Sequence, residues 1–157
     1  MKYILLIVSL LFSNLLLSQV KVYSGNSTYS SDIICNIKDG KVYKKNSNYS
    51  SDILCKILGS KIYDKNSNYS SDILFNKQDE KVYKGNSNYT SDVFMNIKDG
   101  KVYKENSNYS SDIILNIKDG KAYDGNSNYS SDVLFTIDSM VSLEEFVAIF
   151  YVFKYVY

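Results

Sequence analysis

Aspartate, cysteine and tyrosine are the side chains of this sequence that could carry chemistry, and all three types stand at a fixed spacing. One aspartate, two tyrosines and one asparagine return every twenty residues, six times in succession. The sequence contains no His, which removes the usual general base and the commonest metal ligand. The chemistry to consider is therefore that of carboxylates, thiols and tyrosine rings.

The repeated aspartates form the first candidate site. A glycosidase needs two carboxyl groups in different environments, one of them with a raised pKa, whereas six equivalent aspartates have equivalent surroundings. One carboxylate per repeat is also fewer than calcium-binding loops use. Because Ser-Ser precedes most of these residues, we predict that each closes its own loop through side chain to backbone hydrogen bonds. We predict no catalytic residue, metal or cofactor. The column consists of Asp32, Asp52, Asp72, Asp92, Asp112 and Asp132.

The two cysteines occupy the same column of adjacent repeats. An exported protein could join Cys35 to Cys55 in a disulfide. Phe, Met and Leu fill this column elsewhere, which instead indicates buried apolar positions. If the repeats are hairpins, the two Cα atoms lie about 10 Å apart, beyond the roughly 7 Å that a disulfide spans. We therefore predict two free, buried thiols.

The tyrosine columns are the best candidates for binding. A tyrosine ring offers an apolar face with a polar tip, which suits stacking on sugars or contact with a protein, and the neighbouring Asn and Ser are typical of adaptable binding loops. The same rings could equally pack the repeats together. The residues predicted to bind a ligand are Tyr49, Tyr69, Tyr89, Tyr109, Asn46, Asn66, Asn86 and Asn106.

The charge balance and the N-terminal residues restrict partner and location. Eighteen Lys+Arg stand against 17 Asp+Glu, so the basic surface of a nucleic-acid-binding protein is missing. Lys2 followed by the apolar stretch Tyr3–Leu17 predicts a signal peptide over residues 1–18, cleaved near Ser18. A stretch of about 15 residues is short for a membrane anchor. We expect a periplasmic, cell-surface or secreted protein with no transmembrane span in the mature chain.

A period of twenty residues organises residues 20–138 into six repeats. Two architectures can carry such a period. One is a meander of six β-hairpins, open or closed as a ring; the other is a solenoid with one coil per repeat. A solenoid would stack six Asp and six Lys at about 4.8 Å, where like charges repel. The sequence therefore favours an all-β array of hairpins.

The hairpin turns predict which columns face inward. Asp-Gly pairs such as Asp99-Gly100 suit a two-residue type I′ turn, whereas Gly59-Ser60 and Asp79-Glu80 suit it less well. With Asp99-Gly100 as the turn, Ile97 faces Val102, and Met95 lies on the same, inner side. Asn96 and Tyr103 then share the other face.

The last residues break the period. Ser142 followed by Glu145 matches a capping box and predicts a helix over residues 142–157. This segment is apolar nearly all round, so it must be buried. We expect it to pack on the inner face or the open end of the repeats, with a terminal β-strand as the alternative.

The repeated pattern resembles the four-fold beta-flower repeats of exported or uncharacterised bacterial proteins. The resemblance rests on Val82-Tyr83, Val93-Phe94-Met95, Asp99-Gly100 and Val102-Tyr103 and extends over about Val20 to Ile137. Six units replace four, and Asn-Ser stands where that family carries Asp-x-x-Gly. The resemblance implies a ring of hairpins and no known reaction.

Two functional hypotheses follow. The first is an exported, non-enzymatic repeat protein that presents several near-identical weak sites to a cell-surface glycan or protein and gains affinity by avidity. The alternative is a purely structural or accessory module with no ligand of its own. The sequence leaves the oligomeric state open.

Overall fold

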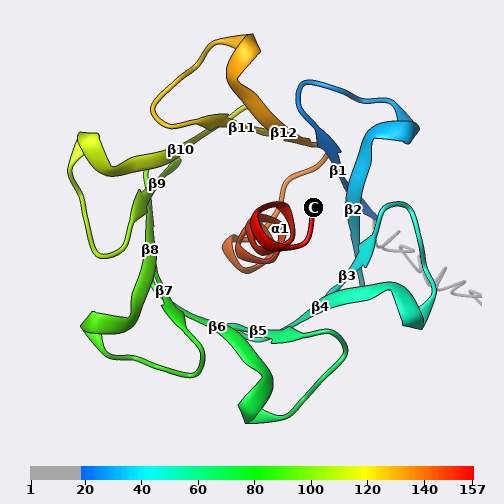
Figure 1. Ribbon diagram of the computed structural model, residues 1–157, viewed down its shortest axis with the longest axis horizontal. Coiled ribbons are helices and arrows are strands. Elements are labelled where there is room, and N and C mark those ends of the chain that lie inside the picture. The colour runs from blue at the N-terminus through cyan, green and yellow to red at the C-terminus, as the bar shows by residue number, and fades with distance from the viewer. Residues whose placement is uncertain (1–18) are drawn as a thin grey trace, which may run out of the picture.

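Twelve strands form a closed ring with six outward lobes in the computed structural model, which describes residues 19–157 (Figure 1). The strands make one antiparallel barrel, in which β1 pairs with β12 and every other pair is consecutive along the chain. The predicted all-β array of six hairpin units with a C-terminal helix is therefore confirmed, and the structure closes this array into a ring, which the sequence left open. The signal peptide predicted over residues 1–18 lies outside the described residues.

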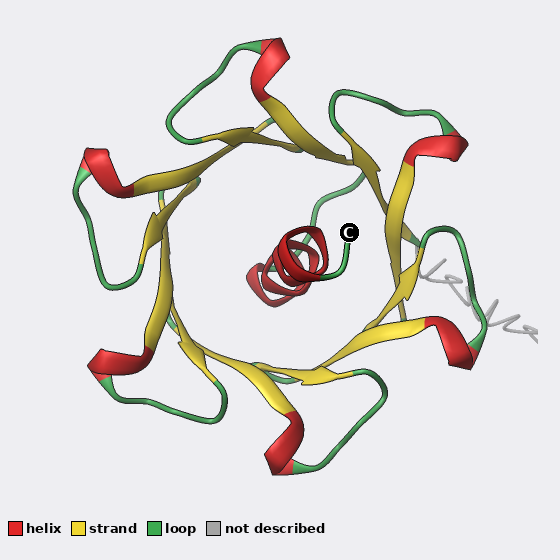
Figure 2. Ribbon diagram, in the orientation of Figure 1, coloured by secondary structure: helices red, strands yellow, loops and turns green. Residues whose placement is uncertain are grey.

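Each unit contributes a short strand, a lobe and a longer strand. Each lobe carries a single 3-10 turn, from Ser30–Asp32 in the first unit to Ser130–Asp132 in the sixth (Figure 2). The elements of the barrel and its helix are β1 Val20–Ser24, β2 Ile33–Lys38, β3 Lys41–Lys44, β4 Ile53–Leu58, β5 Lys61–Asp64, β6 Ile73–Gln78, β7 Lys81–Lys84, β8 Val93–Lys98, β9 Lys101–Lys104, β10 Ile113–Lys118, β11 Lys121–Asp124, β12 Val133–Ile137 and α1 Leu143–Tyr155.

The two-residue turns set the predicted register. Ile97 lies opposite Val102 and Asn96 opposite Tyr103, as the Asp99-Gly100 turn predicts. Both residues of that turn have positive φ, +50° and +72°, which is the conformation of a type I′ turn. The turn at Asp79-Glu80 keeps the same register, with Gln78 opposite Lys81, although only its first residue has positive φ.

A β-bulge interrupts every unit where its longer strand begins. In the third pair of strands, Val42 lies opposite Cys55 and Tyr43 opposite Ile53, so that Leu54 has no opposite residue. A bulge redirects the side chains around it. Leu54 consequently packs against the barrel core, and Ile53 shares the outer face with Tyr43. Simple alternation along the strand does not predict this arrangement.

Helix α1 fills the lumen of the barrel (Figure 1). Barrels of about eight strands are filled by their own side chains, whereas more strands enclose a wider space, and here the helix occupies that space.

The predicted capping box is present: Ser142 Oγ accepts from the Glu145 N–H, and the Ser142 N–H donates to Glu145 Oε2. The helix ends at Tyr155 instead of the predicted residue 157. The Val156 N–H still makes the helical bond to the Val152 carbonyl, but the Tyr157 N–H donates to that same carbonyl and not to the carbonyl of Phe153. Among the described residues, no helix combines the length and hydrophobicity that a bilayer span requires.

One ion pair distinguishes a single orientation of the helix within a nearly six-fold symmetric barrel. Lys77 replaces the isoleucine that the other five units carry in this inward-facing column. Its Nζ lies 3.0 Å from Glu144 Oε1 in the first turn of α1. Because only one of six equivalent positions offers this lysine, the contact distinguishes one rotation of the helix from the other five.

The ring closes where β1 meets β12, which are joined by no turn. Val22 lies opposite Ile137, and Asp138 Oδ1 accepts a 2.8 Å hydrogen bond from the Lys21 N–H. The Asp138 N–H donates in return to the Lys21 carbonyl at 3.1 Å. The corresponding cross-strand pair inside a hairpin is Lys118 opposite Lys121, where the covalent turn holds two like charges together. At the non-covalent junction an aspartate replaces the lysine.

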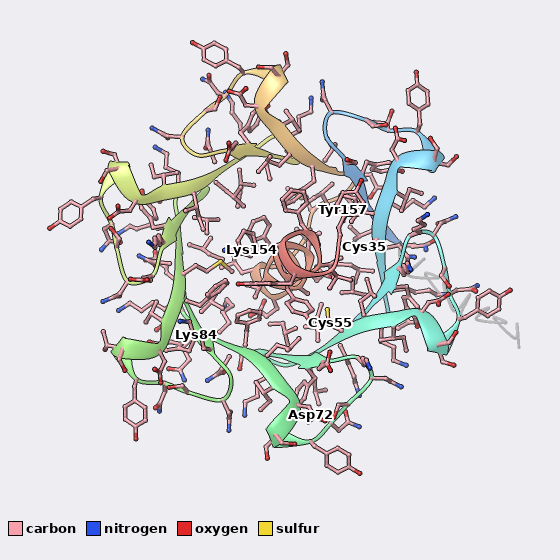
Figure 3. The ribbon with its side chains drawn as sticks, viewed as in Figure 1. Cys35, Cys55, Asp72, Lys84, Lys154 and Tyr157 are labelled. Carbon is pink, nitrogen blue, oxygen red and sulfur yellow. The ribbon has the colours of Figure 1, made fainter. Side chains whose placement is uncertain are left out.

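The cysteines are free and buried, as predicted. Cys35 is on β2 and Cys55 is on β4, with β3 between them, and both lie inside the barrel wall (Figure 3). Burial raises the pKa of the Cys35 thiol to about 12 and raises the pKa of the Cys55 thiol as well. Such thiols are protonated at neutral pH and are poor nucleophiles.

Candidate functional site

Each lobe is built by a backbone turn at either end and a network of side chains between them. In the third unit, the Ser67 N–H donates to the Asp64 carbonyl at 3.2 Å, and the Asp72 N–H donates to the Tyr69 carbonyl at 3.0 Å. Tyr69 stands between these turns in extended conformation, with φ −81° and ψ 140°. The tyrosines of all six lobes share this conformation within a few degrees.

A serine and an aspartate hold the tyrosine backbone in place. The Tyr69 N–H donates to Ser67 Oγ at 3.1 Å, and the Ser67 hydroxyl donates to Asp72 Oδ2 at 2.6 Å. Asp72 Oδ1 accepts a second hydrogen bond from the Ser71 hydroxyl at 2.9 Å. The aspartate therefore closes its loop as predicted, but by accepting from serine hydroxyls and not through the predicted bonds to the backbone. The serine hydroxyls take the place of backbone N–H groups as donors to the Asp72 carboxylate, because both serines belong to the same short loop.

Three of the lobe aspartates have the lowered pKa that a hydrogen-bond acceptor shows. The Ser67 hydroxyl is the main cause that lowers the pKa of Asp72, with Ser71 second; the same two hydroxyl positions lower the pKa of Asp32 and Asp132. A general acid near neutral pH needs a raised pKa. In the part of the chain that the structure describes, no three acidic, cysteine or histidine side chains gather as metal ligands.

Replacing Ser67 by alanine should raise the pKa of Asp72 toward its ordinary value. The lowered pKa means that the ionised carboxylate contributes stability above the ordinary pKa of about 3.9, and this contribution is lost as the pH falls through the folded value. A carboxyl carbon NMR titration measures the shift. Ser71→Ala is the matched control, since its hydroxyl is the smaller cause, and should give a smaller rise. An Asp72 pKa that Ser67→Ala leaves unchanged contradicts this account.

An asparagine on the longer strand attaches most lobes to the barrel wall. Asn36 of β2 donates through Nδ2 to the Ser47 carbonyl at 2.8 Å in the next lobe, and Asn116 reaches Ser127 in the same way. Thr136 of β12 takes this role across the ring junction and donates to the Gly25 carbonyl at 2.8 Å. Each lobe is therefore held by the unit that precedes it around the ring.

The two tyrosine columns have opposite roles. The column on the short strands packs under the lobes: Tyr43 and Tyr83 have only 9% and 8% of their surface exposed. The column on the lobes does the reverse, with exposed fractions between 71% and 76%. Figure 3 labels Asp72 of one lobe and shows that it lies on the periphery of the ring, far from α1. The exposed lobe tyrosines are Tyr29, Tyr49, Tyr69, Tyr89, Tyr109 and Tyr129.

The eight residues predicted to bind a ligand all lie at the surface of the lobes. Each predicted tyrosine is accompanied on its own lobe by the exposed asparagine three residues earlier, such as Asn66 beside Tyr69. The prediction covers four lobes and misses the two equivalent ones, which carry Asn26 with Tyr29 and Asn126 with Tyr129. The twenty-residue period already contains the signal that identifies them.

Comparison with known families gives a match over most of the chain. The sequence model described as 6-fold beta flower protein matches residues 22–150, and its six-fold character agrees with the six units of the barrel. Comparisons with curated proteins and with solved structures give no match. The matched range includes every strand from Val22 onward and the first half of α1, so this chain belongs to the 6-fold beta flower protein family.

Proposed function

We propose that the chain is an exported, non-enzymatic protein that binds a cell-surface glycan or protein multivalently through its lobes. The observation that carries this proposal is the set of six lobe tyrosines, each more than 70% exposed in the same backbone conformation. Repeated large rings held out in water suit a partner that covers them, because burying an aromatic ring is favourable. Export rests on residues 1–18 alone.

A glycan is the partner that the lobe chemistry favours. The ring face of Tyr69 suits stacking on the apolar face of a sugar, and the exposed amide of Asn66 offers a donor and an acceptor for sugar hydroxyls. One such site is small and weak. Six copies around one ring can engage a repeating polysaccharide together, and linked sites raise affinity by about 10²–10⁴-fold without new contacts.

Changing Tyr49, Tyr69 and Tyr89 together to serine should weaken binding to a polysaccharide by at least about tenfold, since three linked sites are removed. A glycan array identifies the polysaccharide, and surface plasmon resonance on the immobilised sugar measures the loss. Tyr157→Ser is the matched control, because Tyr157 is also exposed, at 68%, but lies outside the lobes. The Tyr157→Ser variant should bind the polysaccharide with the same affinity as the unchanged chain.

The same experiment separates the alternatives. Binding to a protein in place of a glycan, lost in the triple variant, moves the proposal to a protein partner. Glycan binding that the triple variant retains contradicts the role of the lobes. Absence of binding to any array sugar or surface protein favours the purely structural module.

A further inference from the structure

A pocket opens at the end of the barrel where α1 terminates, and its lining departs from the six-fold repeat. It has a volume of about 300 Å³ and is lined by Lys84 of β7, Lys104 of β9 and Lys154 of α1, with Phe94 and Tyr155 among its apolar walls. We call these five residues the lysine pocket. Figure 3 labels Lys154, which extends from α1 toward the side of the barrel where Lys84 lies.

The lysine pocket concentrates positive charge in one sector of the ring. The column that supplies Lys84 and Lys104 holds Ser24, Asp64 and Asp124 in three other units and Lys44 in the fourth, so this is the one place where two adjacent units both carry lysine in this column. One acid, Glu105, also lines the pocket. Within residues 19–157 the one ion pair is that of Lys77 with Glu144, which leaves the three ammonium groups of the pocket without a carboxylate at ion-pair distance.

Phe94 gives this sector an aromatic wall. The β-bulge column is aliphatic in every other unit, and the bulge turns Phe94 toward the barrel core. The Lys154 Nζ lies 5.3 Å from the Phe94 ring centroid and 5.6 Å from that of Tyr155, within the range of cation–π attraction. These rings hold one ammonium group at the pocket while leaving it free to contact an anion. Lys154 also offsets the negative end of the helix dipole.

We propose that the lysine pocket binds a phosphate monoester attached to an aromatic or otherwise apolar body. A phosphate monoester carries about −1.5 to −2 charges near pH 7 and three acceptor oxygens, which matches three lysines opposed by one glutamate. Lysine binds phosphate as a point charge. The volume is at the lower end of the range for small-molecule sites, about 300–1,000 Å³, so a single ring with its phosphate fits. This site is single and independent of the six lobes.

Calorimetric titration of the full chain with phenyl phosphate tests the proposal. We expect saturable binding that weakens with added salt, and weaker binding of inorganic phosphate, which lacks the ring. Lys84→Gln combined with Lys104→Gln should reduce affinity for phenyl phosphate by about tenfold or more, because each removes a charged hydrogen-bond donor. Phe94→Leu should reduce it about three- to tenfold and change the binding of inorganic phosphate less, because the Phe150 and Tyr155 rings still hold the Lys154 ammonium group.

The controls use the repeat itself. Leucine already stands in the bulge column at Leu54 and Leu74, so Phe94→Leu should fold. Lys118→Gln combined with Lys121→Gln removes an equal charge from the turn end of the barrel and should leave affinity unchanged. The triple tyrosine variant of the lobes should bind phenyl phosphate normally, which separates this site from the proposed function.

A final comparison identifies the source of the phosphate. Flotation with phosphatidic acid vesicles, beside phosphatidylcholine vesicles, tests a lipid whose headgroup is itself a phosphate monoester. Vesicle binding that requires Lys84 and Lys104 supports the site with a lipid as its ligand, and binding of phenyl phosphate alone supports a soluble ester. Failure of both probes to bind, or binding that the double lysine variant retains, overturns the proposal.

Discussion

A chain lacking residues 143–157 should not form a stable monomeric ring. The deletion removes α1, whose buried side chains include Phe146, Val147, Ile149 and Phe150. Burying one such large apolar side chain contributes about 1.5–3 kcal/mol, while a whole domain is stable by only about 5–15 kcal/mol. The loss also leaves the inner wall of the barrel facing an empty lumen. Exposed apolar surface of that extent promotes aggregation.

Size-exclusion chromatography and thermal melting measure this effect. We expect oligomers or aggregates, and loss of a cooperative melting transition. Deleting only Val156 and Tyr157, which are exposed, is the control and should leave a monomer with nearly unchanged melting. Ile149→Asp keeps the chain length but places a charge in the core, and should reproduce the defect. If the chain without residues 143–157 stays monomeric and melts as before, the helix does not seal the barrel.

Gly120→Ala should destabilise the ring by about 2–4 kcal/mol. Gly120 has φ of +73°, and an added Cβ would lie 2.8 Å from the Ile137 carbonyl oxygen. A left-handed conformation costs a side-chain-bearing residue about 1–2 kcal/mol, and the contact with backbone adds to this cost. Ile137 belongs to β12, whose other edge pairs with β1. The added Cβ therefore displaces the backbone of β12, the strand that closes the ring.

Glu80→Ala is the matched control for this substitution. Glu80 occupies the same second turn position as Gly120, and its carbonyl accepts the equivalent hydrogen bond from the Ile97 N–H at 2.7 Å. Its φ is not positive, so alanine should change the free energy of unfolding by no more than about 0.5 kcal/mol. Denaturant unfolding of both variants measures the difference. Equal stability of the two variants contradicts the requirement for glycine at position 120.

Local interactions explain how much of the architecture could be predicted from the sequence. Asp99-Gly100 prescribes a two-residue turn, and that turn alone places Ile97 opposite Val102. Ser142 and Glu145 cap a helix through bonds that span three residues. The lobes could also be predicted from the sequence, because a nearly identical short segment closes on itself six times through its own serine and aspartate.

Alternation within strands was not enough to place the lysine pocket. A period of two along β8 puts Val93, Met95 and Ile97 on the inner face and Phe94 outside. The bulge, in which Val93 lies opposite Tyr83 and Met95 opposite Val82, moves Val93 to the outer face and Phe94 toward the core. Phe94 then meets Lys154, which comes from a distant part of the chain. A pocket formed between a bulged strand and a distant helix has no sequence pattern within either segment that predicts it.

The sequence by itself determined the six hairpins, their turns and register, the capped helix and the tyrosine lobes. Each depends on residues within about twenty positions of one another, and the period repeats them. Only the tertiary structure decided that the array closes into a ring around α1. Closure joins Lys21 to Asp138 and depends on the curvature accumulated over all twelve strands. That curvature is a sum of small twists that no single repeat specifies. The central helix then fills the space that the strands enclose.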